Sequence, residues 1–213
     1  MPPPLRLAVL GATGRTGRRL VEYALADGHA VRALARDPAA LDALAHPRLD
    51  VRGGDATDAA AVDALVAGCD AVVTALGGGT LADPGRARSD GVRHAAAAMA
   101  RHGVARLVGV AGGGILDLPG VGLRNQRPGY PEAFRHVTQE HVATWAALRD
   151  TGLAWTLACT GDIVPGERTG VYRVLPDEMP EGGRRISVEN LADFLLRETV
   201  EGRFPERRVG VAD

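Results

Sequence analysis

Three glycines near the start of the chain have the spacing of a phosphate-binding turn. Gly11, Gly14 and Gly17 follow the apolar run at residues 7–10 in the pattern G-x-x-G-x-x-G. Where a strand turns sharply into a helix at such glycines, the backbone can approach a pyrophosphate closely, and the free N–H groups of the helix N-terminus attract the phosphates. The pattern therefore predicts dinucleotide binding. The alternative is a tight turn between strand and helix that binds no ligand.

A basic residue follows the second predicted strand, residues 30–35. Arg36 stands where an acidic residue would accept a hydrogen bond from the ribose 2′-hydroxyl of NAD, and a basic residue suits the 2′-phosphate of NADP instead. Arg15, inside the glycine turn, could reach the same phosphate. We therefore expect NADP(H) to be preferred over NAD(H). Asp37 keeps the opposite preference open, because a shift of one residue would place a carboxylate at the strand end.

Other predicted strands also end in small or polar residues. Asp55 leads the loop after a short strand at 49–51, where it could contact the adenine, although a role as a turn former or cap is an equal alternative. Glycines 77–79 follow the apolar strand at 69–76, where close approach to a ligand and a flexible loop are both possible. The expected nucleotide contacts are Gly11, Thr13, Gly14, Arg15, Thr16, Gly17, Arg36, Asp55, Ala56, Leu76, Gly77 and Gly78.

Short apolar strands alternate with amphipathic helices as far as a fifth strand at 106–111, and this order predicts the fold. We expect one α/β domain, residues 1–213, with a Rossmann-type doubly wound parallel sheet and helices on both faces. Ligands then bind beyond the C-terminal strand ends. Residues 115–185, which include an irregular Pro/Gly-rich stretch, are expected to form the substrate side. Long helices are predicted at 83–102 and 132–150.

The composition argues against several classes of protein. All 25 basic residues are arginine, and with 26 acidic residues the formal net charge is −1, so no basic surface points to nucleic acid. No apolar run reaches the roughly 18 residues of a membrane helix. Cys69 and Cys159 are isolated, no cluster has metal-ligand spacing, and the first four residues show no signal-peptide pattern. We expect a metal-free cytoplasmic protein, a monomer or small homo-oligomer, whose partner is a small molecule.

Several segments together resemble one protein family. The chain is similar to the atypical short-chain dehydrogenase/reductases of the NAD(P)H-binding, NmrA-like group, and within it to the branch that contains flavin reductase (biliverdin-IXβ reductase). The resemblance covers nearly the whole chain. The segments that carry it are GATGRTGRRLV, RALARDP, VVTALG, HGVARLVGV, LRDTGLAWTLA and RRISVENLADFLL.

The resemblance also shows what this chain lacks. Members of the wider superfamily use a Tyr-x-x-x-Lys pair on the helix before the sixth strand, and those positions fall here on Val137 and His141. The flavin-reductase-like branch lacks the pair too and carries a His at the position of His141. The resemblance thus implies hydride transfer to a flat, easily reduced acceptor, which needs little proton chemistry from the protein.

His141 and Tyr130 are the candidate catalytic residues. His141 could bind the ribose or deliver a proton near neutral pH, or be a surface residue packed on Trp145. Tyr130 could donate a proton or stack on the acceptor, or simply pack in its loop. The basic run at 124–127 could bind an acidic acceptor or be solvated. The sequence predicts an NADPH-dependent oxidoreductase that passes hydride to a flavin, quinone or similar conjugated acceptor. The alternative is a non-catalytic NmrA-like redox sensor that binds NADP(H).

Overall fold

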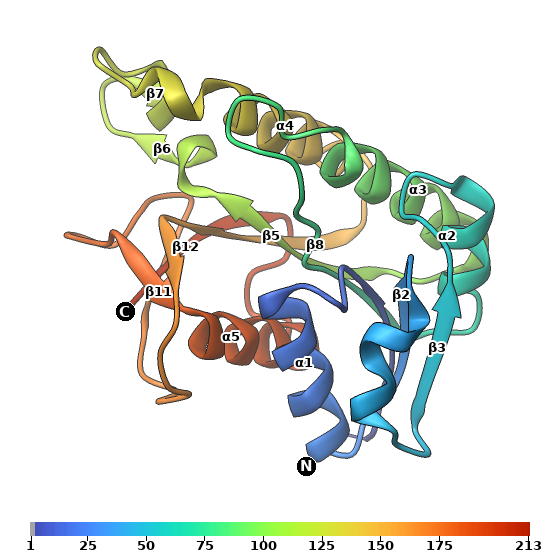
Figure 1. Cartoon of the computed structure of the whole chain (residues 1–213). Helices are drawn as coiled ribbons and strands as arrows, with labels where there is room; N and C mark the ends of the chain where they lie inside the picture. The colour runs from blue at the N-terminus through green and yellow to red at the C-terminus, as the bar shows by residue number, and fades with distance from the viewer. Residues whose placement is uncertain (1–2) are drawn as a thin grey trace.

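The computed structural model describes residues 3–213, and its centre is a single eight-stranded sheet (Figure 1). Met1 and Pro2, which the predicted domain includes, lie outside the described residues. The strand order is β10-β12-β8-β5-β4-β1-β2-β3, and every neighbouring pair is parallel except β10 with β12. The strands are β1 (Arg6–Leu10), β2 (Ala30–Ala35), β3 (Leu49–Gly53), β4 (Ala71–Thr74), β5 (Arg106–Gly112), β8 (Ala154–Thr160), β10 (Arg173–Pro176) and β12 (Arg207–Ala212).

Helices cover both faces of this sheet, as the sequence predicts (Figure 1). Successive residues of a strand point to opposite faces. In β1, Leu7 and Val9 are buried on one side with α1 (Arg15–Ala26) and α5 (Val188–Glu201). Ala8 and Leu10 are buried on the other side with the second group of helices. That group is α2 (Ala59–Val66), α3 (Ala87–His102) and α4 (Arg135–Ala146).

Two predicted helices are too long. The helix predicted from residue 83 begins at Ala87, because Gly85 has φ +61° and residues 80–83 form a turn closed by the Thr80 hydroxyl and the Asp83 backbone N–H. The helix predicted at 132–150 is α4 alone, preceded by the short 3₁₀ segment η4 (Glu132–Phe134). Asp58 caps α2, because its carboxylate accepts hydrogen bonds from two backbone N–H groups of that helix.

Short elements fill the connections. The Pro/Gly-rich stretch that we expected to be irregular, residues 119–131, contains one strand of a small antiparallel hairpin and a 3₁₀ turn. Of the described residues, no helix is both long and apolar enough to cross a bilayer. The remaining short elements are η1 (Pro38–Leu44), η2 (Gly113–Ile115), β6 (Asp117–Leu118), β7 (Gly122–Leu123), η3 (Arg124–Gln126), β9 (Asp162–Val164) and β11 (Arg185–Ser187).

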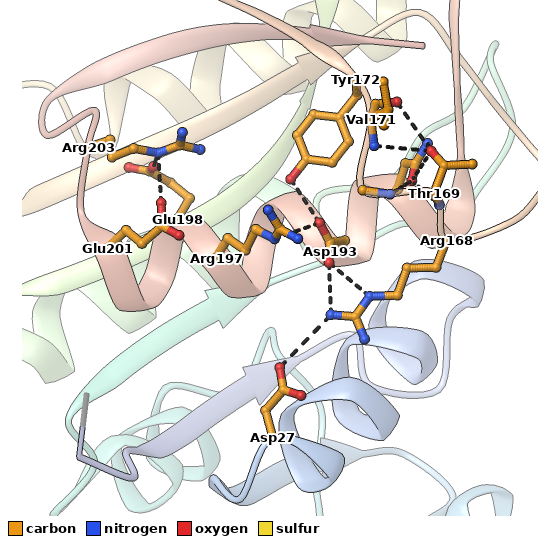
Figure 2. A network of polar contacts seen from close by, with 12 residues as sticks. Asp27, Arg168, Thr169, Val171, Tyr172, Asp193, Arg197, Glu198, Glu201 and Arg203 are labelled. Atoms are coloured by element: carbon orange, nitrogen blue, oxygen red, sulfur yellow. Dashed lines mark hydrogen bonds and ion pairs between the residues drawn. The ribbon is translucent and has the colours of Figure 1, made fainter. Parts of the chain in front are cut away.

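The α5 helix carries a carboxylate, Asp193, that is wholly buried. It accepts hydrogen bonds from Arg168 Nε at 2.8 Å and from the Tyr172 hydroxyl at 2.9 Å (Figure 2). Arg197 Nε lies 3.0 Å from Oδ2, the carboxylate oxygen of Asp193 that also accepts the hydrogen bond of Tyr172. Burial and the neighbouring carboxylate raise the pKa of the Tyr172 hydroxyl. These contacts fasten residues 168–172 to the helix.

A second wholly buried carboxylate, Glu198, lies further along the same helix. It accepts hydrogen bonds from Arg106 Nη2 at 2.7 Å, from the Thr156 hydroxyl at 3.1 Å and from the Phe204 backbone N–H at 2.9 Å. Burial lowers the pKa of the Arg106 guanidinium, and Glu198 offsets part of that effect. Because Arg106 begins β5, this pair ties α5 to a strand that runs into the site described next.

Candidate functional site

A cleft of about 780 Å³ lies beyond the C-terminal ends of the parallel strands β1, β2, β3, β4, β5 and β8. The chain winds outward in opposite directions from β1 and β4, which are neighbours in the sheet. In open α/β sheets, ligands bind at such a point of reversal. The volume suits a ligand of nucleotide size.

The glycine turn forms one wall of the cleft, and its geometry requires glycine. Gly11 has φ +82°, and a Cβ there would lie 2.5 Å from the carbonyl oxygen of Ala75. A Cβ on Gly17 would overlap the carbonyl oxygen of Gly11. Helix α1 begins next to the turn, with Gly14 as an N-cap that offers no side-chain hydrogen bond. The first N–H groups of the helix have no partner within the helix, so the wall fits a phosphate group.

The structure gathers nearly all of the predicted nucleotide residues along this cleft. Gly17 does not line it, because its role is to let α1 pack directly behind the turn. The predicted residues that do line it are Gly11, Thr13, Gly14, Arg15, Thr16, Arg36, Asp55, Ala56, Leu76, Gly77 and Gly78.

Arg15 and Arg36 are exposed, line the cleft and form no ion pair with any of residues 3–213. Asp37, which could have reversed the cofactor preference, instead accepts a hydrogen bond from the backbone N–H of Ala39 and caps η1. Of these two neighbouring side chains, only Arg36 is part of the cleft lining.

Asp55 lines the cleft and also shapes its own loop. Its carboxylate accepts hydrogen bonds at 2.8 Å from the backbone N–H and the hydroxyl of Thr57. These bonds hold the pKa of the Asp55 carboxyl below its usual range, and the charge of Arg36 adds to the effect. The role as a turn former, one of the two alternatives, is therefore present in the structure, and the carboxylate is an ionised acceptor at neutral pH.

His141 lies on α4 with its ring against Gly112 at the end of β5. A Cβ on Gly112 would come within 2.8 Å of the ring atom Cδ2 and 3.1 Å of Nε2. The ring lines the cleft, and its Nδ1 is buried with no hydrogen-bond partner among the described residues. Burial lowers the pKa of His141 to about 4, and the positive charge of Arg88 contributes.

A neutral imidazole does not suit the proton-donor role, which is one of the roles that the sequence suggests for His141. With its pKa near 4, His141 carries no positive charge at neutral pH and is a poor source of a proton there. It retains one N–H donor and one ring-nitrogen acceptor. What this side chain offers a ligand is a hydrogen bond.

The structure does not bring Tyr130 into the cleft. Its hydroxyl lies 2.8 Å from the hydroxyl of Thr138, and it is not among the cleft-lining residues. The basic run at 124–127 lies outside the lining as well. Both belong to the segment before α4, which packs over η2 and its glycines.

Sequence reasoning missed two charged residues that line the cleft: Arg86, which pairs with Asp90, and Arg88. Arg88, in the first turn of α3, is partly buried and faces the site. Its Nη1 donates to the carbonyl oxygens of Gly78 at 3.3 Å and Pro84 at 3.2 Å. A signal was available, because Arg88 precedes Val92 by four residues and so shares the helix face that points to the sheet. A charged side chain on the buried face of a helix is energetically unfavourable unless it lines a site.

Comparison with known proteins gives the family. A family model described as NAD(P)H-binding matches residues 11–200. The chain belongs to this NAD(P)H-binding family. A 3β-hydroxysteroid dehydrogenase/Δ5→4-isomerase of Mycobacterium tuberculosis is 40% identical over 90 residues, 39% of this chain and 24% of that protein. The chain thus spans only a minor part of that relative's length.

Solved structures share the fold of this NAD(P)H-binding protein over its whole length. A Burkholderia pseudomallei protein, provisionally named an exported protein, is 28% identical with a TM-score of 0.83, covering 98% of this chain and 100% of that one. A Streptococcus pneumoniae protein, provisionally named an NADH-flavin reductase, is 24% identical with a TM-score of 0.82, covering 98% and 99%. The predicted Rossmann-type fold and the predicted membership of an NAD(P)H-binding family are confirmed.

Proposed function

We propose that this protein is an NADPH-dependent reductase that passes hydride to a flavin, quinone or similar conjugated acceptor. The observation that carries the proposal is a cleft with a glycine turn and unpaired arginines at one end and a neutral histidine at the other. Membership of the NAD(P)H-binding family supports a nicotinamide cofactor. When bound, NADPH would supply the hydride.

The adenosine end of the cofactor would be held by Arg15 and Arg36. Both side chains line the cleft, and a 2′-phosphate would provide the ion-pair partner that no described carboxylate gives them. Thr13 and the first N–H groups of α1 would hold the pyrophosphate. The oxygens of Asp55 would accept hydrogen bonds near the adenine.

At the other end, the cleft is lined by Gly112 and Thr160 from two strands and His141 from α4. Among the described lining residues there is no tyrosine, cysteine or lysine, and His141 is neutral. The protein therefore offers no strong acid to a reacting carbonyl. An acceptor that spreads the added electrons over a conjugated ring needs none, because water can protonate it afterwards.

Location and assembly stay predictions. Cys69 and Cys159 are both buried and free, which fits the reducing compartment expected from the sequence. We propose a cytoplasmic protein acting as a monomer or small homo-oligomer, with a small molecule as partner.

The test is a fluorescence titration with NADPH and NADH, followed by NADPH oxidation in the presence of FMN, a quinone and a dye. We expect tighter binding of NADPH than of NADH and acceptor-dependent oxidation above the rate without protein. Tight binding without turnover on any acceptor would contradict the reductase and favour a redox sensor. Failure to bind either nucleotide would mean that the glycine turn serves only to connect β1 and α1.

A further inference from the structure

Arg88 lies in the cleft and has no ion-pair partner among the described residues. No acidic oxygen of the described residues lies within ion-pair distance of its guanidinium, and its only hydrogen bonds are the two from Nη1 to backbone carbonyls. The neighbouring acids have other partners. Asp90 pairs with Arg86 and Arg93. Glu140 accepts a hydrogen bond from the Ser89 hydroxyl at 2.9 Å.

The two carbonyl contacts fix the guanidinium and leave donors free. Nη2 lies 3.9 Å from the position that a Cβ on Gly77 would take, so it faces the open side of the glycine loop after β4. Burial lowers the pKa of Arg88, and Glu140 only partly compensates. A guanidinium that is partly desolvated and still has free N–H donors is arranged to receive an anion.

The position of Arg88 assigns that anion to the acceptor end of the cleft. Glu140 of α4 acts on the charge of Arg88, and that charge in turn acts on His141 of the same helix. Beside it a smaller hollow of about 270 Å³ shares residues 84–86 with the cleft and extends to the first turns of α4. Arg15 and Arg36, by contrast, stand at the ends of β1 and β2, in the half of the sheet that includes β3.

We propose that Arg88 binds a carboxylate or phosphate of the acceptor, so that this protein prefers acidic conjugated acceptors to neutral ones. The inference rests on the proposed reductase function. The shared chemistry is an anionic group attached to a reducible ring. Hydrogen-bonded charge pairs of this kind change affinity by about tenfold or more.

FMN and riboflavin provide a matched pair, because they share the isoalloxazine ring and differ by one phosphate. The experiment measures the Kd of each flavin by fluorescence quenching in the presence of saturating NADP⁺, which requires no turnover. We expect the wild type to bind FMN at least about tenfold more tightly than riboflavin. Arg88→Met should remove most of that preference and change the Kd for riboflavin and for NADPH by much less than the Kd for FMN. Arg88→Lys should keep part of it.

Arg93→Met is the matched control, since Arg93 is an exposed arginine of the same helix, pairs with Asp90 and does not line the cleft. Three results would overturn the proposal. An equal loss of affinity for both flavins in Arg88→Met would mean that Arg88 only supports the packing of the site. Weaker NADPH binding with an unchanged preference for FMN would mean that Arg88 binds the cofactor. A wild type that binds FMN no better than riboflavin, or binds neither, would also contradict it. Separate turnover assays decide the reductase itself, because the binding preference can stand or fall without it.

Discussion

Around α5, arginine side chains are matched to buried carboxylates, whereas in the cleft three arginines have none within ion-pair distance. Asp193 and Glu198 are wholly buried, and each is in contact with at least one guanidinium (Figure 2). Arg15, Arg36 and Arg88 line the cleft without such a partner among the described residues. One residue type, the only strong cation in the chain, is therefore used in two ways.

The presence or absence of an ion-pair partner distinguishes arginines that stabilise the fold from arginines that are free to bind a ligand. A buried ion pair fixes two elements to each other, and removing one member leaves an uncompensated charge. An arginine kept in a cleft without a counter-charge adds nothing comparable to stability. Its charge becomes useful only when an anion arrives, so its effect should appear in binding.

The largest effect is expected from breaking the Arg106–Glu198 pair. Arg106→Met should lower the free energy of unfolding by about 3–5 kcal/mol, because the Glu198 carboxylate has no exposed surface and would keep only the more distant Arg203, whose Nε lies 3.7 Å away. Urea unfolding at neutral pH measures the loss. NADPH binding below the unfolding transition should be unchanged.

The exposed pair of Arg52 with Asp50 is the control for this prediction. Arg52→Met should cost much less stability than Arg106→Met, because solvent screens that pair. Adding Glu198→Gln to Arg106→Met should recover part of the stability, since it removes the buried charge. A loss below about 1 kcal/mol for Arg106→Met would remove the contrast between the two regions.

An intermediate effect is expected from acid, through His141. In the unfolded chain, His141 takes up a proton near the ordinary His pKa of about 6.5. In the folded protein its pKa is about 4, because burial and the charge of Arg88 oppose a positive imidazole. Between these values the unfolded state binds more protons, so stability falls as pH falls. From pH 7.5 to pH 4.5, the wild type should lose about 2 kcal/mol more than His141→Gln in urea unfolding.

Arg88→Met tests the origin of this pH dependence. Removing its charge should raise the pKa of His141 and shrink the difference between the proteins with and without the histidine. Parallel pH profiles for wild type and His141→Gln would show that the imidazole is not held neutral by its surroundings.

The smallest effect is expected at Arg36, and in binding alone. Arg36→Asp should reduce the preference for NADPH over NADH by about tenfold, because a carboxylate repels the 2′-phosphate and can accept a hydrogen bond from a 2′-hydroxyl. Stability should be almost unaffected, since the side chain is exposed and unpaired. Arg52→Asp reverses a charge outside the cleft and should leave both affinities alone. Equal losses for the two nucleotides in Arg36→Asp would remove Arg36 from the 2′-phosphate.

Local patterns predicted much of the fold because their causes are local. The alternation of apolar strands and amphipathic helices and the turn at Gly11 each depend on a few neighbouring residues. The start of α3 was predicted wrongly for the opposite reason. Asp83 and Pro84 are typical of a helix start, but Gly85 takes a left-handed conformation and delays the helix to Ala87.

The sequence by itself determined the parallel sheet, the glycine turn and the placement of Arg36 at a strand end, since these follow from periodicity, spacing and the conformational freedom of glycine. Only the tertiary structure decided that His141 is neutral, that Tyr130 lies outside the cleft lining and that Arg88 faces the site. Those properties depend on how α3 and α4 pack beside β5. Burial and charge act through space, between residues that the chain separates by dozens of positions.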